Sequence, residues 1–389
     1  MNEVTERAAD ANGIDLSAQA VIARFQARFD DSQVRAEPSK EWVRAALERK
    51  GAPRCPVRLK RTSYDLLARY GDALGELFHA YPDDLVLTQP YESFIGFRGS
   101  GMEPVDTIRA FTEEAEWTDE WGTSWGHAAG GVGATPIANP LTDWSQLDDY
   151  LAHRVPDGRD PARLAGAIPS LELQGPNRYF IGMTYFGLFE RFHGLRGMES
   201  AFEDFYTSPR EVHRLLDALL DYQVATIREW GQLANVDTIF TTDDWGSQLA
   251  LMIRPEMWRE FFAARYRRMT DEAHRWGMAF MFHSCGNVFA IIGDLIDAGV
   301  DIIDPLQPEA MDLKAVAREF GGKVAFAGGI SDQRLERMSP GQVRDEVRRA
   351  IDVLGAPYGN AYMIAPSNML MPGIPLENLV TLFEACHDQ

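Results

Sequence analysis

Cysteine is scarce in this chain: Cys55, Cys285 and Cys386 are the only three among 389 residues. An odd number of widely spaced cysteines argues against a disulfide framework and indicates a reducing compartment. The first fifteen residues are polar and acidic and lack the basic and then apolar segments of a secretory signal. The expected location is therefore the cytoplasm.

Long apolar runs and excess positive charge are also absent. No run approaches the roughly 18–20 residues that a membrane span needs. The chain has 38 Lys and Arg against 58 Asp and Glu, a formal net charge of −20, so it should repel nucleic acid and anionic membranes. No Gly-x-Gly-x-x-Gly pattern opens a helix, which disfavours a dinucleotide-binding domain. Neither nucleic acid nor a membrane is an expected partner.

The chain does have a regular alternation of apolar strands and helices from about residue 236 onward. Near-continuous apolar strands imply that both faces of a sheet are covered, and the short connections imply parallel strands with right-handed crossovers. Earlier strands are predicted at 85–88 and 179–184. The later predicted strands are 236–241, 278–282, 300–303, 324–327 and 361–365, and the helices between and after them are 255–276, 288–297, 313–320, 340–354 and 375–386.

A doubly wound sheet and a (β/α)₈ barrel both fit this alternation. The length of the chain and the polar residues at the strand ends favour the barrel, whose sites lie at the C-terminal ends of its strands. The predicted organisation is a (β/α)₈ TIM barrel over residues 54–389, preceded by a helical extension over residues 1–53. Residues 105–135 are rich in Trp and Gly, which predicts twisted strands or a hairpin.

The segment Phe282-His283-Ser284-Cys285-Gly286 is the most informative part of the sequence. Residues i and i+2 of a strand project from the same face, so His283 and Cys285 are aimed at one point at a strand end. Imidazole nitrogen and thiolate sulfur are ligands that Zn²⁺ prefers. The alternative is a structural histidine beside a buried free cysteine, since free cysteine is among the most buried residue types.

Other polar and aromatic residues also follow predicted strands. Of Asp243 and Asp244, one is expected to cap the next helix. Asp244 is expected to face the cavity as a base, a metal ligand or a binder of a cationic substrate group. The candidate catalytic residues are Asp244, Gln307 and Asn368, and the candidate substrate-binding residues are Tyr91, Glu92, Tyr185, Phe186, Gln248 and Asp304.

Residues 39–385 resemble the uroporphyrinogen decarboxylase superfamily, which includes cobalamin-linked methyltransferases and coenzyme M alkyltransferases. Besides the His-Ser-Cys-Gly segment, the matching segments are Arg44-Ala45-Ala46-Leu47-Glu48, Arg54-Cys55-Pro56-Val57, Asp119-Glu120-Trp121-Gly122, Leu195-Arg196-Gly197, Asp243-Asp244-Trp245-Gly246-Ser247-Gln248, Ala298-Gly299-Val300-Asp301, Phe326-Ala327-Gly328-Gly329-Ile330 and Pro375-Leu376-Glu377-Asn378. They occur in the family's order. The resemblance implies a distorted (β/α)₈ barrel, in agreement with the alternation of strands and helices.

The resemblance is closer to the methyl- and alkyltransferase branch than to the decarboxylases. The tetrapyrrole decarboxylases carry an Arg-Gln-Ala-Gly-Arg motif and need no metal, whereas this chain has Arg58-Leu59-Lys60-Arg61 near that place. The transferase branch holds zinc with a His-x-Cys pair, matched by His283 and Cys285, and a distant cysteine. That cysteine normally follows the last strand, where this chain has no thiol. The candidates to complete the metal shell are Asp244, Asp304, Glu92 and Asn368.

The resemblance therefore implies a methyl- or alkyl-group transferase that depends on zinc or another divalent metal and activates a thiol or a similar acceptor. Cobalamin would come only with a partner corrinoid protein, because the chain lacks an Asp-x-His-x-x-Gly motif. A small-molecule substrate and a second copy of the chain are the other expected partners. Three alternatives stay open: a metal-free decarboxylase of a porphyrinogen-like polycarboxylate, using Arg58, Arg61, Arg98 and Arg178; a metal-dependent lyase; and a corrinoid- or tetrapyrrole-binding protein.

Overall fold

A curled parallel sheet is the centre of the fold. The computed structural model describes residues 39–88, 114–127, 134–165, 167–168, 171–172, 175–184, 186–233 and 235–389. Within these residues the sheet has seven strands in the order β1-β5-β6-β7-β8-β9-β10. They are β1 (Leu85–Thr88), β5 (Tyr179–Thr184), β6 (Thr238–Thr242), β7 (Ala279–His283), β8 (Ile302–Leu306), β9 (Ala325–Ile330) and β10 (Tyr362–Pro366).

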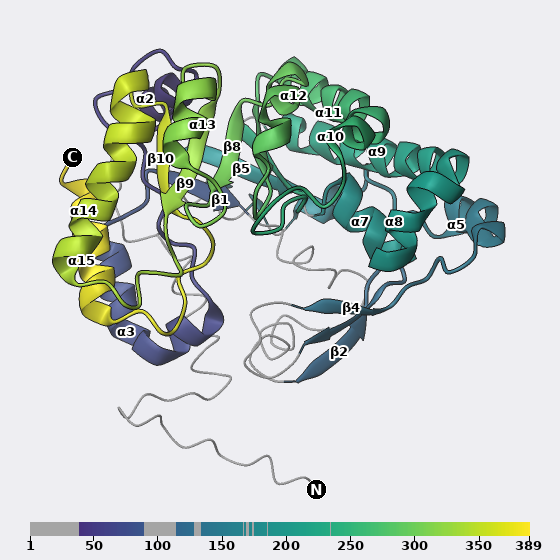
Figure 1. Cartoon of the computed structure of the whole chain (residues 1–389), viewed down its shortest axis with the longest axis horizontal. Helices are drawn as coiled ribbons and strands as arrows, with labels where there is room; N and C mark the ends of the chain where they lie inside the picture. Colours follow the sequence, from purple (N-terminus) through teal and green to yellow (C-terminus); the bar gives the residue numbers. More distant parts are fainter. Residues whose placement is uncertain are drawn as a thin grey trace, which may run out of the picture.

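Most of the helices lie on the outside of this sheet, as Figure 1 shows, whereas α2 (Lys40–Leu47) packs against the side chains on its inner face. The helices are α2 (Lys40–Leu47), α3 (Tyr64–Ala80), α5 (Leu147–His153), α7 (Leu188–Arg196), α8 (Met198–Thr207), α9 (Pro209–Gln232), α10 (Pro255–Trp258), α11 (Ala264–Arg275), α12 (Ile292–Asp297), α13 (Leu313–Phe320), α14 (Pro340–Ala350) and α15 (Leu376–His387). A π-helical turn, Arg259–Ala263, joins α10 to α11, and another, Ile351–Gly355, follows α14. No helix in the described ranges combines the length and the hydropathy that crossing a bilayer requires.

The two edge strands of the sheet approach each other across one short segment. Val57 forms a parallel bridge to Ile364 of β10, and the Arg58 N–H donates to the Ile364 carbonyl at 2.9 Å. On the other side, the Asp84 N–H donates to the Val57 carbonyl at 3.0 Å, just before β1. The structure confirms an α/β fold with a curled, TIM-barrel-like parallel sheet. Its described residues contain seven strands in that sheet, where eight were predicted.

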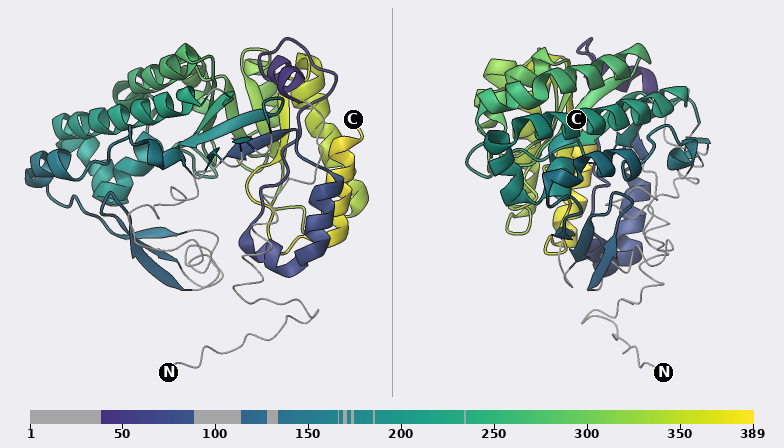
Figure 2. Two further views of the ribbon diagram at one scale, coloured as in Figure 1. Left: turned by 180° about the vertical axis from the view of Figure 1, so that it is seen from behind. Right: turned by 90° about the vertical axis from the view of Figure 1, so that its right-hand side faces the viewer.

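A separate antiparallel sheet projects below α7 and α8 (Figures 1 and 2). It contains β2 (Ala115–Thr118), β3 (Ser124–His127) and β4 (Thr135–Ala138). The side chain of Trp125 is buried, and its indole N–H donates to Asp119 at 3.1 Å; the Arg191 guanidinium of α7 pairs with the same carboxylate at 2.9 Å. The predicted strands in this Trp-rich region are confirmed, and the tryptophans there pack the small sheet against the main body.

Most of the predicted boundaries agree with the structure to within three residues. The strand predicted at 179–184 and the helix predicted at 313–320 are exact. The prediction placed Asp304 after its strand, which was wrong, because Asp304 lies inside β8. A prediction from hydropathy ends the strand at the first charged residue. In the structure the strand continues through Asp304, because the Arg58 guanidinium lies 2.7 Å from its carboxylate and neutralises the buried charge. The domain boundary at residue 53 stays a prediction, and residues 1–38 of the expected extension lie outside the described part.

Candidate functional site

Three side chains with different donor atoms converge at the ends of two neighbouring strands. Asp244 follows β6, His283 is the last residue of β7, and Cys285 comes two residues later; β6 and β7 are paired in parallel, with Thr242 opposite His283. The ligating atoms of the three side chains lie within 4.8 Å of one another. His283 Nε2 is 3.6 Å from Cys285 Sγ and 3.8 Å from Asp244 Oδ1. Three protein ligands of this kind are typical of catalytic zinc sites.

The orientation of the His283 ring is fixed by a buried carboxylate. His283 Nδ1 is 2.6 Å from Asp304 Oδ2, so the other ring nitrogen, Nε2, faces Cys285 and Asp244. Asp304 in turn accepts a hydrogen bond from Arg58 at 2.7 Å. Burial alone would raise the pKa of Asp304, but Arg58 and His283 outweigh it and hold that pKa well below its usual range. A metal-binding histidine is commonly oriented by a carboxylate in this way.

The Cys285 thiol lies in a setting that favours its neutral form unless a cation is bound. Burial raises the pKa of Cys285 above its ordinary value, and the negative charge of Asp244 raises it further. Asp244 Oδ1 also accepts the Cys285 backbone N–H at 2.7 Å, which ties the two loops together. Coordination to a metal would supply the positive charge that a thiolate needs here. The donor set therefore fits a divalent metal.

The adjacent aspartates Asp243 and Asp244 have different partners. The Asp243 carboxylate is buried and accepts the backbone N–H groups of Leu188, Phe189 and Glu190 at the start of α7. Burial raises the pKa of Asp243 to about 6. Asp243 therefore caps α7, whereas the Asp244 side chain is 40% exposed and faces His283.

Two glycines allow the loops of the site to touch. Gly286, after Cys285, has a φ of +78°, and a Cβ added there would lie 2.3 Å from the Gly246 carbonyl oxygen. Gly246 follows Asp244 by two residues, and a Cβ on it would lie 2.5 Å from the Asn287 nitrogen. Any side chain at either position would push apart the loops that carry Asp244 and Cys285.

We expect Gly286→Ala to lower the free energy of unfolding by about 1–3 kcal/mol more than an alanine at a glycine of similar φ that has open space around it. The reason is that the added methyl group meets the Gly246 backbone. Urea denaturation measures the loss. Gly277→Ala is the matched control, since Gly277 has a similar φ of +71° and open space around its Cα. Equal losses in the two variants would show that the loop contact contributes nothing.

The structure brings some of the other predicted site residues to the centre and places others elsewhere. The Asn368 amide nitrogen is 3.6 Å from the Cys285 sulfur. Gln307 Oε1 accepts the Gly286 N–H at 2.9 Å, so this side chain braces the loop. Both Asp304 oxygens have protein partners, which fits a supporting role better than substrate contact.

Gln248 lies in the exposed loop after Gly246. Tyr91, Glu92 and Tyr185 lie outside the described residues.

Phe186 lies directly beyond β5, on a strained backbone. Its φ is +46°, which is uncommon for a non-glycine residue. Its ring stacks on Trp125 with 5.3 Å between centroids, and the Arg191 guanidinium lies 4.9 Å from the ring centroid. The ring therefore connects the small sheet to the strand end next to β6.

Arg58 supports the site from behind Asp304, whereas the sequence predicted this arginine only as a possible ligand for polycarboxylates. The side chain is 5% exposed and pairs with Asp304. Arg61 lies 3.5 Å from the same carboxylate. A carboxylate beside an apolar strand indicates that a cationic partner is needed, but it does not identify the residue that supplies the charge.

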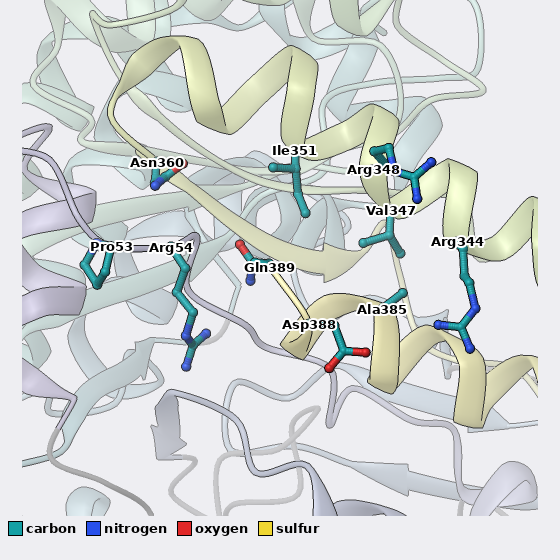
Figure 3. A pocket seen from close by; sticks show the side chains of 10 residues that line it. All are labelled: Pro53, Arg54, Arg344, Val347, Arg348, Ile351, Asn360, Ala385, Asp388 and Gln389. Atoms are coloured by element: carbon teal, nitrogen blue, oxygen red, sulfur yellow. The ribbon is translucent and has the colours of Figure 1, made fainter.

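A cavity of about 380 Å³ lies at the other end of the strands, between α14, α15 and residues 53–54 (Figure 3). Asn360, just before β10, is among its lining residues, whereas Asn368 follows β10. Three arginines line the cavity, and each has an acidic partner: Arg54 with Asp84, Arg344 with Glu384, and Arg348 with Asp345. These pairs leave little positive charge for an anionic ligand, so the strand-end cluster remains the better candidate site.

Comparisons with known proteins agree with this architecture. Residues 191–389 match the family described as uroporphyrinogen decarboxylase (URO-D). A methyltransferase from Methanosarcina mazei has a similar structure, with a TM-score of 0.65 and 16% identity over 91% of this chain and 99% of that chain. An N-acetyl-D-glucosamine-6-phosphate deacetylase mutant from Mycobacterium smegmatis gives a TM-score of 0.26 and 12% identity over 60% of this chain and 55% of its own, a likeness too slight to use. A search of curated proteins finds no match.

Proposed function

This chain belongs to the uroporphyrinogen decarboxylase family, and we propose that it is a metal-dependent transferase of methyl or alkyl groups. The observation that carries the proposal is the cluster of Asp244, His283 and Cys285, whose ligating atoms lie within 4.8 Å of one another. The fold shared with a protein named as a methyltransferase, over 91% of this chain, supports the same reading.

The metal would be zinc or another divalent ion, held by His283 Nε2, Cys285 Sγ and an Asp244 oxygen. Three protein ligands leave a coordination position for the reacting molecule, as in catalytic zinc sites. When bound, such an ion stabilises a thiolate or polarises an oxygen of the substrate. One sulfur, one nitrogen and one oxygen form a harder donor set than two thiolates and an imidazole.

The residues around the cluster would position its groups. Asp304 keeps the His283 proton on Nδ1, because the carboxylate accepts that N–H, and Arg58 keeps Asp304 ionised. Gln307 holds the loop that carries Cys285 by accepting the Gly286 N–H. The ligand geometry would therefore be set largely before a metal binds.

The remaining expectations concern partners and assembly. A small molecule would supply or accept the transferred group, and any cobalamin would come with a corrinoid protein that binds this chain. A second copy of the chain and a cytoplasmic location stay predictions.

We further propose that the segment at Val57 is the eighth strand position of the barrel, since it bonds to β10 on one side and to Asp84 on the other.

The decarboxylase alternative has less support, because only Arg58 and Arg61 of its four candidate arginines come together among the described residues, and both lie beside Asp304. Arg58 is paired with Asp304, and Arg178 donates to the Asp83 carbonyl at 2.5 Å. Arg61 lies near Asp304 at 3.5 Å, and Arg98 lies outside the described residues. A metal-dependent lyase would use the same ligand cluster, and product analysis separates it from a transferase.

The test is a methyl-transfer assay with zinc-loaded protein. Isotope-labelled methyl ethers, methylamines and methyl thioethers are offered with a thiol or cob(I)alamin as acceptor, and the labelled methyl group is followed by mass spectrometry. We expect transfer for at least one class and its loss after chelation, with recovery on adding zinc. Carbon dioxide release from a porphyrinogen, without metal and without methyl transfer, would contradict the proposal.

A further inference from the structure

Asn368 contacts the Cys285 sulfur from a part of the barrel that is distant along the sheet. It lies two residues beyond the end of β10, whereas Cys285 follows β7, and β8 and β9 lie between these strands in the sheet. The Asn368 amide nitrogen is nevertheless 3.6 Å from Cys285 Sγ. The contact therefore spans the inside of the curled sheet at its C-terminal end.

The loop around Asn368 holds the amide in one orientation. Asn368 Oδ1 accepts the backbone N–H of Met369 at 2.9 Å, so the nitrogen is the atom turned toward the sulfur. The preceding residue, Ser367, is buried; its N–H donates to the Ile330 carbonyl at 2.7 Å, and its hydroxyl bonds to Asp332. An amide side chain would bind a metal through its oxygen, and that oxygen is already engaged.

We propose that Asn368 is a positioning residue of the metal centre and not one of its ligands. Its N–H donates to the Cys285 sulfur and holds that sulfur beside His283 Nε2 and Asp244 Oδ1. Asp244, His283 and Cys285 would hold the metal, which could then also bind the reacting molecule. The inference rests on the metal-dependent function proposed above.

A hydrogen bond from Asn368 would matter most after Cys285 has become a thiolate, because bonds to an ionised partner are roughly twice as strong as neutral ones. Residues that orient metal ligands from outside the coordination shell typically contribute about 10–100-fold to metal affinity. Removing the Asn368 N–H without changing the shape of the side chain should therefore weaken metal binding by about 10–100-fold. Replacing Asn368 with cysteine should add a second sulfur ligand to the metal.

Cobalt(II) substitution and zinc-edge X-ray absorption test these statements on the full chain. The variants are Asn368→Leu, which keeps the approximate shape and removes the N–H, and Asn368→Cys. Cys386→Ala is the control, since that cysteine is buried in α15. Wild-type protein and the control should show a sulfur-to-cobalt absorption band for one thiolate. Asn368→Leu should keep that band with about 10–100-fold weaker affinity, and Asn368→Cys should roughly double its intensity.

The outcomes separate this inference from the proposed function. If wild-type protein binds cobalt but Asn368→Leu binds it with unchanged affinity, the positioning role is wrong while the metal site stands. If the leucine variant loses one oxygen or nitrogen neighbour of zinc in the absorption spectrum, Asn368 is a ligand and the inference is overturned. If wild-type protein binds neither cobalt nor zinc, the proposed function fails and this inference fails with it.

Discussion

Replacing Cys285 with serine is expected to abolish stoichiometric metal binding and to lower the methyl-transfer rate by at least about 100-fold. This loss exceeds the one expected when a residue that only orients a metal ligand is replaced. A hydroxyl is a poor substitute for a thiolate, because it stays protonated near neutral pH and is a weak ligand for zinc. The remaining donors, His283 and Asp244, would leave only two protein ligands. Metal content by mass spectrometry and single-turnover methyl transfer measure the two effects.

Cys386→Ser is the matched control for that variant. It changes a second free cysteine, buried in α15 away from the strand-end cluster, and should leave the metal content unchanged. The folded fraction of both variants is compared by circular dichroism. A well-folded Cys285→Ser protein that still binds metal at wild-type affinity would show that the sulfur is not a ligand.

Replacing Arg58 with alanine is expected to lower the free energy of unfolding by about 3–5 kcal/mol, the range found when one partner of a buried ion pair is removed. The Asp304 side chain is fully buried, and Arg58 is 2.7 Å from it. Without the guanidinium, the carboxylate would keep only Arg61, at 3.5 Å, and His283 as compensating groups. Urea denaturation at neutral pH measures the change.

Two further variants make the Arg58 result interpretable. Arg58→Ala combined with Asp304→Asn should recover part of the loss, because no carboxylate then remains buried without its partner. Arg344→Ala removes an exposed partner of Glu384 and should cost only about 0–1 kcal/mol. A loss for Arg58→Ala as small as that for Arg344→Ala would contradict a structural role for the buried pair.

Local sequence patterns were sufficient for much of the fold and for the centre of the site. Apolar strands separated by helices predicted the parallel sheet. The helix predicted to begin at residue 340 does begin there, and Ser339 caps it by accepting the Gln342 N–H. The spacing of His283 and Cys285 placed both on one face of a strand end, where their ligand atoms are 3.6 Å apart. These features depend on neighbours a few residues away.

Features that depend on distant segments could not be predicted in the same way. The contact of Asn368 with Cys285 requires the order and curvature of the whole sheet. The pairing of Arg58 with Asp304 joins residues 246 positions apart, so the apolar pattern of β8 gave no indication of it. The sequence suggested that the barrel begins at Val57 to Leu59, but a bridge one residue long gave no indication that Val57 pairs with Ile364 of β10.

The most direct test of a metal centre at Asp244, His283 and Cys285 is the metal content of wild-type protein, purified after expression in zinc-supplemented medium and measured by mass spectrometry. We expect a stoichiometric divalent metal that is lost in His283→Ala. Wild-type protein that is folded and contains no stoichiometric metal, even after incubation with excess zinc, would contradict the proposed site.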